Sequence, residues 1–351
     1  MALSDRLLAK LKDPALAMDR APVAGNWLGS DETAGTFDVF NPSTGECIAA
    51  LPDMDRSHVV RAIDAAYLAQ KAWARRTGKE RAAILRTLHD LMVSHADDLA
   101  TILTMEMGKP FEEARGEILY GASYVEWFGE EAKRAYGDTI PGHRRDARIL
   151  VVKQPVGVVA AVTPWNFPCA MLARKLAPAL AAGCAMVAKP AAETPLSALA
   201  LAYLAERAGL PAGLFSIILT TDAVAIGQEF TSNDKVRKLT FTGSTNVGRT
   251  LMRQGADQIL KLGLELGGNA PFIVFDDADL DAAVDGAMVA KYRNNGQTCV
   301  CANRFYVQSG VYDVFAEKLA ARVSEMRVGD GFEEAVDAGP LIDAKALAKV
   351  E

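Results

Sequence analysis

Cys299 is a candidate nucleophile because it lies on a connection between two predicted elements, where residues with a chemical role are often found. The connection reads Arg-Asn-Asn-Gly-Gln-Thr-Cys-Val-Cys-Ala-Asn-Arg over residues 293–304. It follows a helix-like run, Leu280–Ala290, and precedes a strand-like run, Phe305–Val307. Gly296 permits backbone conformations that a residue with a Cβ resists. A lone cysteine is by default a buried thiol, so the hypothesis depends on partners elsewhere in the chain.

Two polar side chains could serve the same chemistry. Asn166 lies between Pro164 and Pro168, which restrict the backbone and hold the amide as a donor that could stabilise an oxyanion. Glu265 lies between apolar neighbours, where removal from water would make its carboxylate a better general base. The alternatives are a stiff turn at Asn166 and a Glu265 carboxylate that merely pairs with a cation such as Arg293 or Lys175.

Two further segments have features of nucleotide-binding loops. Lys189 ends an apolar run ahead of a helix, where a lysine can bind a ribose hydroxyl or a phosphate. Gly243-Ser244 opens a helix-like run after another apolar run, an arrangement that presents backbone N–H groups to a pyrophosphate. The Gly-x-Gly-x-x-Gly fingerprint is absent. A solvated lysine and a plain strand-to-helix turn remain the alternatives.

The elements that position these residues are alternating apolar strands and amphipathic helices. Such alternation predicts an α/β fold with a Rossmann-type parallel sheet covered on both faces, in which ligands bind beyond the carboxyl ends of the strands. The predicted strands are 156–162, 184–188, 214–219, 238–241 and 259–264, and the predicted helices between them are 171–182, 196–208, 223–230 and 245–254.

Composition excludes several functional classes. The net charge of −6 argues against a nucleic-acid partner, because no basic excess is present to neutralise phosphates. No apolar run is long enough to span a bilayer. The four histidines all lie in the first 143 residues, and Cys299-x-Cys301 has no second ligand pair nearby, so we expect neither a His-based triad nor a metal site. Five scattered cysteines indicate a reduced, cytoplasmic protein.

The chain divides into four predicted regions. Residues 1–137 carry three helical blocks and form the N-terminal part of the cofactor-binding domain; Ser57 is the expected N-cap of the first block, 58–76. Residues 138–154 are an extended segment with an exposed edge, which could pair with another subunit. Residues 155–265 form the dinucleotide-binding sheet, and residues 266–351 form the catalytic domain.

In this order, the loops around Asn166, Lys189, Gly243 and Glu265 and the Cys299 segment resemble the NAD(P)-dependent aldehyde dehydrogenase superfamily. The resemblance covers essentially the whole chain and is greatest to the succinate-semialdehyde dehydrogenases, through residues 264–272 and 296–304. It implies that the Cys299 thiolate attacks an aldehyde carbon, that the Asn166 amide and the Cys299 N–H hold the oxyanion, and that Glu265 activates the water that releases the acid.

The resemblance also assigns the cofactor-contacting positions. In many NAD-preferring relatives, a glutamate lies three residues after the lysine that matches Lys189, and this glutamate repels the 2′-phosphate of NADP. Here that position is Ala192, with Glu193 one step further, so we expect NADP to be preferred and NAD to remain usable. The cofactor-contacting positions carried over are Trp165, Asn166, Lys189, Pro190, Ala191, Ala192, Gly243, Ser244 and Leu266.

The resemblance also predicts which residues bind the substrate and which residue could regulate activity. Arg174 and Arg293 match positions where succinate-semialdehyde dehydrogenases grip the far carboxylate, which an arginine binds in a bidentate manner. In the same subfamily, a thiol in the position of Cys301 can form a disulfide with the nucleophile, so Cys301 is either a redox switch or a packed thiol. Cys169 and Cys184 are expected to be core residues.

The sequence ends within a predicted helix that Asp343 caps, whereas members of the resembled family continue further. We therefore expect an incomplete catalytic domain here, and a homodimer or homotetramer at full length. The alternatives to oxidation of succinate semialdehyde are a dehydrogenase for another small-molecule aldehyde, a cofactor-binding fragment without turnover, and a cysteine hydrolase that uses Cys299 and Glu265 without a cofactor.

Overall fold

A five-stranded parallel sheet is the centre of the computed structural model, which describes residues 3–351. Its strand order is β11-β10-β7-β8-β9, and every neighbouring pair is parallel. β8 is an inner strand and is buried throughout; β9, the edge strand beside it, is also buried because β1 and α7 pack against it. The predicted α/β class is confirmed. The strands are β7 (Val158–Val162), β8 (Ala185–Lys189), β9 (Phe215–Ile217), β10 (Val236–Gly243) and β11 (Lys261–Leu266).

Helices connect these strands as the apolar periodicity predicts. α6 and α7 pack against β7, β8 and β9, while α8 and α9 pack against β10. The observed bounds differ from the predicted ones by up to three residues; at the last strand the reason is that Ile259 has a positive φ of 51° and is 90% exposed, so the strand begins at Lys261. The connecting helices are α6 (Pro168–Ala181), α7 (Leu196–Arg207), α8 (Ala223–Ser232) and α9 (Thr245–Gly255).

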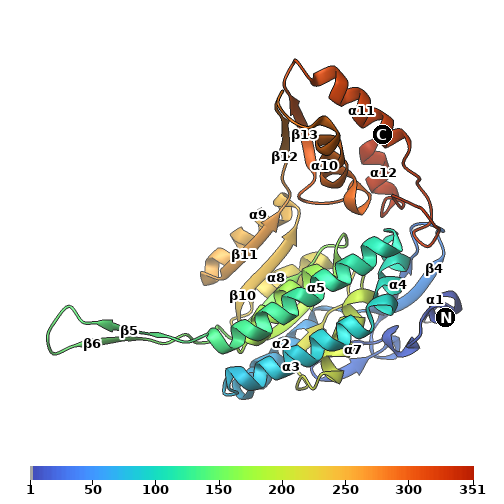
Figure 1. Ribbon diagram of the computed structural model, residues 1–351. Coiled ribbons are helices and arrows are strands. Elements are labelled where there is room, and N and C mark those ends of the chain that lie inside the picture. Colours follow the sequence, from blue (N-terminus) through green and yellow to red (C-terminus); the bar gives the residue numbers. More distant parts are fainter. Residues whose placement is uncertain (1–2) are drawn as a thin grey trace.

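The N-terminal region adds a helical layer to the sheet (Figure 1). α3 and α5 pack on α6, and α4 packs on α7. Asp55, not Ser57, caps α2: its carboxylate accepts the N–H groups of Ser57 and His58, so the predicted cap was wrong by two residues. The elements are α1 (Asp5–Lys10), β1 (Ala21–Val23), β2 (Asn26–Leu28), β3 (Gly35–Phe40), β4 (Cys47–Asp53), α2 (Arg56–Ala74), α3 (Gly78–Ser94), α4 (Ala96–Met107) and α5 (Phe111–Glu131).

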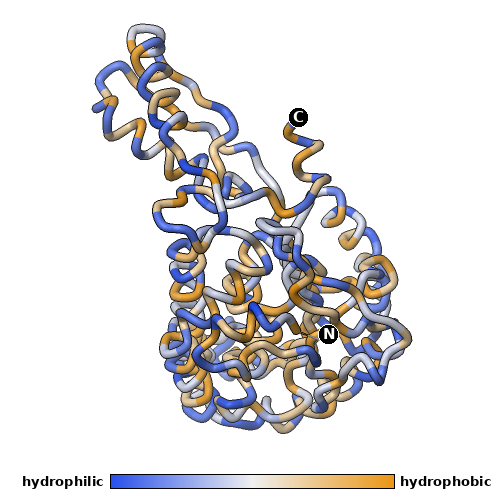
Figure 2. Tube along the Cα trace, turned by 90° about the vertical axis from the view of Figure 1, so that its right-hand side faces the viewer, coloured by the Kyte–Doolittle hydropathy of each residue, from blue (hydrophilic) through white to orange (hydrophobic). Residues whose placement is uncertain are grey.

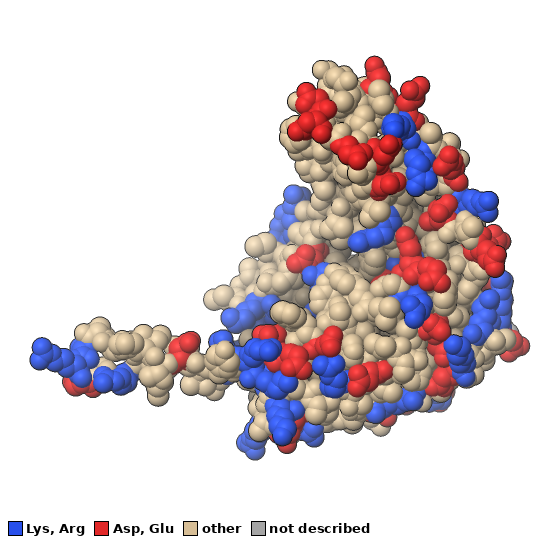
Figure 3. All heavy atoms as spheres, viewed as in Figure 1, with Lys and Arg blue, Asp and Glu red and all other residues tan. Residues whose placement is uncertain are grey.

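An antiparallel hairpin projects from the body of the molecule (Figure 1). It consists of β5 (Asp138–Pro141) and β6 (Arg148–Val151), and every residue of both strands is exposed. Lys and Arg side chains gather at its far end (Figure 3). The predicted extended segment, residues 138–154, therefore contains both strands of the hairpin, and Leu150 of β6 and Val152 just after it are 72% and 74% exposed. Pairing with another subunit through this hairpin stays a prediction.

The C-terminal part is a smaller unit that stands above the larger body (Figure 1, Figure 2). It has its own hydrophobic cluster, formed by Val274, Val284, Ala287 and Phe315, separate from the large core. The elements are the parallel pair β12 (Ala270–Val274) and β13 (Ala302–Val307), with α10 (Leu280–Tyr292), α11 (Tyr312–Ser324) and α12 (Ala344–Val350).

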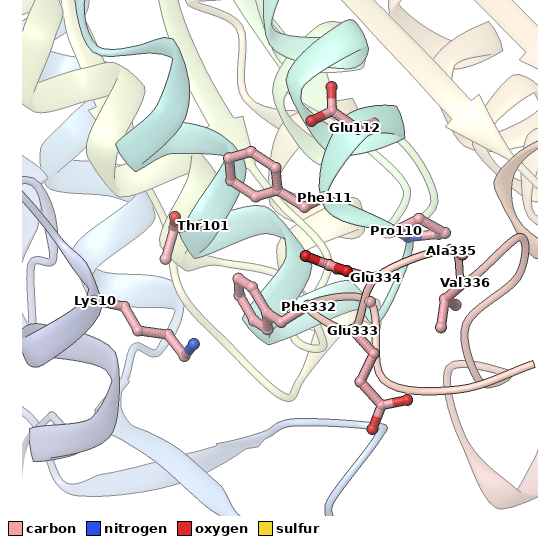
Figure 4. A pocket seen from close by; sticks show the side chains of 11 residues that line it. Lys10, Thr101, Pro110, Phe111, Glu112, Phe332, Glu333, Glu334, Ala335 and Val336 are labelled. Atoms are coloured by element: carbon pink, nitrogen blue, oxygen red, sulfur yellow. The ribbon is translucent and has the colours of Figure 1, made fainter.

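The segment after α11 returns to the helical layer of the larger body. Phe332 contacts the Phe111 ring at a centroid distance of 6.4 Å, and the Lys10 ammonium lies 4.1 Å from the Phe332 ring centre (Figure 4). The Phe111 N–H donates to the Gly331 carbonyl at 2.9 Å. These contacts tie the smaller unit to α1 and α5. Across residues 3–351, no helix has the length and the apolar character that crossing a membrane requires.

Candidate active site

Four of the five segments that carry candidate residues begin at one edge of the sheet. β7, β8, β10 and β11 are parallel, so their carboxyl ends lie side by side. The register pairs Val162 with Lys189 and Gly243 with Leu266, while Phe241 also pairs with Val162. The sheet thus brings together loops that are up to about a hundred residues apart, as predicted for a parallel sheet.

The Asn166 loop meets the Cys299 loop directly. Asn166 Nδ2 donates to the Gln297 carbonyl oxygen at 2.9 Å, across 131 positions of sequence. An amide carries two N–H donors, so this bond orients the side chain while a second N–H remains. Asn294 supplies a reciprocal contact, because its Nδ2 donates to the main-chain oxygens of Asn166 and Gln297 at 3.0 and 3.2 Å.

The Cys299 loop has an unusual backbone. Asn294, Asn295 and Gly296 have φ values of 58°, 57° and 70°, so three consecutive residues adopt the left-handed region. Asparagine tolerates this region better than most residues do, and the Asn-Asn-Gly sequence is the signal that could have predicted it. The turn leaves Cys299 exposed and buries Asn294 completely. The Cys299 main chain then passes the glycines after β11, since a Cβ built on Gly268 would lie 4.0 Å from the Cys299 oxygen.

Glu265 does not lie in the apolar surroundings expected from its neighbours. It stands on β11, opposite Thr242 of β10, and it is exposed, so the predicted desolvation is wrong. The reason is that β11 is an edge strand with only partly buried residues. Among residues 3–351, no salt bridge joins Glu265 to Arg293 or Lys175.

A cavity of about 390 Å³ lies beside Glu265 and is rich in cations. Its lining includes Glu265 with Arg174, Lys175 and Lys238. Lys175 Nζ donates to Thr240 Oγ1 at 3.1 Å, and burial lowers the pKa of Lys175 to about 8, with the nearby Arg174 charge acting in the same direction. The cavity is therefore suited to a small anion. A larger cavity of about 610 Å³, near Phe332, is lined by none of the candidate residues (Figure 4).

The two arginines expected to bind substrate line different cavities. The Arg174 guanidinium lies 5.3 Å from the Tyr124 ring centre, next to Glu265. The Arg293 guanidinium lies 5.5 Å from the Phe167 ring centre and borders a cavity of about 280 Å³. Arg293 thus packs against Phe167, the residue after Asn166. Arg174 instead lines the same cavity as Glu265.

The strand ends also offer groups that fit a dinucleotide. Lys189 is buried, its Nζ donates to the Pro190 oxygen at 3.1 Å, and burial lowers its pKa. The hydroxyls of Thr163 and Thr242 are buried at this edge without a hydrogen-bond partner in the described residues. Ser244 caps α9 by accepting the Val247 N–H, which leaves earlier N–H groups of that helix free to bind an anion.

The remaining cofactor positions lie around these groups. Pro190 is buried, Trp165, Ala191 and Ala192 are half-buried, and Glu193 is exposed. Leu266 lies against α9, because a Cβ on Gly248 would approach its Cδ2 to 2.6 Å. Gly243 is similarly close to the Phe241 ring, at 2.5 Å from a built Cβ. Gly248 thus lets α9 lie close to the Leu266 side chain, and Gly243 leaves room for the Phe241 ring of its own strand.

The remaining cysteines divide by exposure. Cys301 is buried, and its thiol donates to the main-chain oxygens of Lys291 and Gly296 at 3.3 and 3.6 Å. These contacts fit a packed thiol, whereas Cys299 faces outward. Cys169 and Cys184 are buried as predicted, and burial raises the pKa of both thiols.

Sequence interpretation missed the polar groups inside the helical layer. Lys109 and Glu117 form an ion pair at 2.5 Å whose side chains are each only 1% exposed. Lys109 Nζ also donates to the Asn166 oxygen at 2.8 Å. Nothing in the periodicity of the helical blocks indicated that these charges are buried.

Comparisons with known proteins agree with this geometry. A family model described as "Aldehyde dehydrogenase family" matches residues 27–351. Glutarate-semialdehyde dehydrogenase of Pseudomonas aeruginosa is 62% identical over 97% of this chain, and NADP(+)-type succinate-semialdehyde dehydrogenase of Escherichia coli K12 is 59% identical over 97%. The chain spans 70% of each of these relatives. The crystal structure of succinate-semialdehyde dehydrogenase from Burkholderia pseudomallei superposes with a TM-score of 0.95 at 59% identity, covering 97% of this chain and 70% of that one.

Proposed function

This chain belongs to the aldehyde dehydrogenase family, an enzyme family, and from that premise we propose that it oxidises succinate semialdehyde to succinate with NADP. The observation that carries the proposal is the hydrogen bond from Asn166 to Gln297, two residues before Cys299. It brings a rigid amide donor and an exposed thiol into one neighbourhood. Acyl transfer through sulfur needs that combination.

We propose that Cys299 forms the bond to the aldehyde carbon. As the C–S bond forms, the carbonyl π electrons move to oxygen, and the second N–H of Asn166 and the Cys299 N–H stabilise the negative charge. The bond from Asn166 to Gln297 supports this assignment because it pre-orients the amide before substrate arrives. With a dinucleotide bound at the strand ends, its nicotinamide would supply the hydride acceptor for this oxidation, and collapse of the oxyanion would leave the acyl group on Cys299 as a thioester.

We propose that Glu265 then acts on water. Its exposed carboxylate takes a proton from a water molecule, whose oxygen attacks the thioester carbon. The Cys299 sulfur leaves as a thiolate and the carboxylic acid is released. Exposure gives the carboxylate access to water, and the proposed role rests on the place of Glu265 near the end of β11, just before the glycines that the Cys299 main chain passes.

The substrate proposal rests on a carboxylate at the far end of the aldehyde. Arg174, Lys175 and Lys238 line the cavity beside Glu265, and Arg293 lies near the Asn166 loop. Relatives named for succinate semialdehyde and glutarate semialdehyde are 59% and 62% identical to this chain, which favours an aldehyde with a carboxylate at its far end. These two substrates differ in length by one carbon, and the relatives do not distinguish between them. Glutarate semialdehyde is therefore the second candidate.

Arg174→Ala and Arg293→Ala are each expected to raise KM for succinate semialdehyde by about 10- to 100-fold, the effect of losing a charge-assisted hydrogen bond to a carboxylate. KM for propanal, which has no carboxylate, should change little. Steady-state kinetics on succinate semialdehyde, glutarate semialdehyde and propanal test both the residues and the substrate class. Arg144→Ala on the projecting hairpin is the control. Equal effects on charged and neutral aldehydes contradict the proposal.

The cofactor proposal concerns Ala192. Lys189, the Thr163 and Thr242 hydroxyls and the first turn of α9 could hold the ribose and phosphates, and no carboxylate stands at position 192 to repel a 2′-phosphate. Ala192→Glu should therefore raise KM for NADP at least about tenfold, because like charges brought together cost several kcal/mol, while KM for NAD changes less. Kinetics with both cofactors at fixed aldehyde measure this. A parent protein that clearly prefers NAD defeats the idea.

A further inference from the structure

The Lys109–Glu117 pair has no role in the reaction steps above, yet it is among the most deeply buried polar groups of the molecule. Both side chains are 1% exposed. Lys109 lies between α4 and α5, Glu117 lies on α5, and α5 packs on α6. Removing two charges from water is costly, and well-packed apolar residues often serve stability as well or better. Stability of the fold alone therefore does not account for the presence of this buried ion pair.

The two side chains contact the loop that carries Asn166 and the first turn of α6, which follows that loop. Lys109 Nζ donates to the Asn166 main-chain oxygen at 2.8 Å and lies 4.2 Å from the Phe167 ring centre. Glu117 Oε1 accepts the N–H groups of Cys169 and Ala170 at 3.0 and 3.1 Å. The cation thus holds the loop before Pro168, and the carboxylate holds the first turn of α6 after it.

The same loop contacts the Cys299 segment on its other side. The Asn166 oxygen accepts Lys109 Nζ and Asn294 Nδ2 together, and Asn166 Nδ2 donates to the Gln297 oxygen. Glu113, also on α5, contacts the Cys299 segment as well: its Oε2 accepts the Asn294 N–H at 2.9 Å. Lys109, two residues before α5, and Glu113 in the first turn of α5 therefore contact the two loops on which the proposed chemistry takes place.

We propose that Lys109 and Glu117 are positioning residues that hold Asn166 where its amide can stabilise the oxyanion. This inference rests on the proposed function, because it assigns the pair an effect only through Asn166. The physical reason is that oxyanion stabilisation depends on donors fixed in advance, and a displacement of about 1 Å can cost about 100-fold in rate. The pair grips the main chain on both sides of Pro168, which leaves Asn166 little freedom to move.

The test is a double variant, Lys109→Met with Glu117→Gln, which removes both charges so that neither is left buried alone. We expect kcat for succinate semialdehyde to fall between about 10- and 100-fold, with KM nearly unchanged because the arginines are untouched. The matched control is Arg81→Met. Arg81 is also a buried cation that contacts α6, but it belongs to α3, and its Nε donates to the Ala181 oxygen at 2.9 Å, at the opposite end of α6 and about 20 Å away. Its kcat should stay within about twofold of the parent.

Combination with Asn166→Ala separates positioning from general damage. Asn166→Ala alone should lower kcat by about 100-fold or more, the usual effect of losing an oxyanion donor. If the pair acts through Asn166, its removal in the Asn166→Ala background adds little further loss. Additive losses, or a double variant with parental kcat, overturn the positioning role while leaving the proposed function intact. A silent Asn166→Ala overturns the oxyanion role, and the positioning inference with it.

Thermal unfolding of every variant accompanies the kinetics. If the double variant does not fold, Glu117→Gln alone is compared with the parent and with Asn166→Ala/Glu117→Gln. Gln retains one acceptor for the first turn of α6, so we expect a smaller fall in kcat with the same lack of additivity. A Glu117→Gln protein that folds and turns over at the parental rate overturns the proposal.

Discussion

Cys299→Ala is expected to lose at least about 1,000-fold in kcat, because no other group can form the covalent bond to the aldehyde carbon. Alanine removes the sulfur and little else: Cys299 is exposed, so the fold should keep its thermal midpoint. Steady-state reduction of NADP with succinate semialdehyde measures the loss. Mass spectrometry of the parent protein during turnover should detect an acyl adduct on the peptide that contains Cys299.

The control for this experiment is Cys47→Ala. Cys47 is likewise an exposed free thiol, but it lies on β4 of the N-terminal region, and its thiol donates to the Ala49 oxygen at 3.5 Å. Parental activity of this variant beside an inactive Cys299→Ala protein assigns the chemistry to one sulfur. If Cys299→Ala still reduces NADP at a normal rate, the mechanism is wrong. If the parent cleaves esters without any hydride transfer, the cysteine hydrolase alternative gains support.

Glu265→Gln should separate the two halves of the reaction. The amide keeps the size of the side chain but cannot take a proton from water, so acylation of Cys299 continues while hydrolysis of the thioester slows by about 100- to 10,000-fold. Rapid mixing with excess aldehyde should then give a burst of reduced cofactor close to one equivalent per subunit, followed by a slow steady state. The acyl adduct on Cys299 should persist long enough for isolation.

Glu112→Gln is the matched control, since Glu112 is an exposed glutamate of α5 that borders the cavity near Phe332 rather than the candidate site. It should behave as the parent does. A normal steady-state rate in Glu265→Gln would remove Glu265 from the mechanism. Loss of the burst itself would instead place Glu265 before hydride transfer, and Lys175 beside it would then be the next residue to examine.

Much of the scaffold could be predicted from local pattern. β-branched and apolar runs of four to seven residues, alternating with amphipathic stretches, indicated the strands β7 to β11 and their connecting helices, because side-chain periodicity follows directly from backbone geometry. Parallel pairing then required that Lys189, Gly243 and Glu265 lie near one edge. The prediction of Asp343 as a helix cap is confirmed by its hydrogen bond to the Ala346 N–H at 2.7 Å.

Errors arose where neighbours in space differ from neighbours in sequence. Glu265 has apolar sequence neighbours but belongs to an edge strand, and only the strand order decides that its side chain is exposed. Lys109 follows a glycine and precedes a proline, a context that usually means a solvated turn, yet α5 and the Asn166 loop enclose it. Asn294 could be read only as part of a turn, whereas its buried amide joins two main-chain segments.

By itself, then, the sequence determined which segments form strands and helices, which loops carry reactive side chains, and that the chain is too acidic to favour nucleic acid. Those properties depend on residue type and on spacing along a few turns of backbone. Only the tertiary structure decided that Asn166 contacts Gln297, that Lys109 and Glu117 are buried against the same loop, and that Glu265 faces water. These contacts depend on how separate elements pack, and packing joins residues through space at separations that local periodicity does not encode.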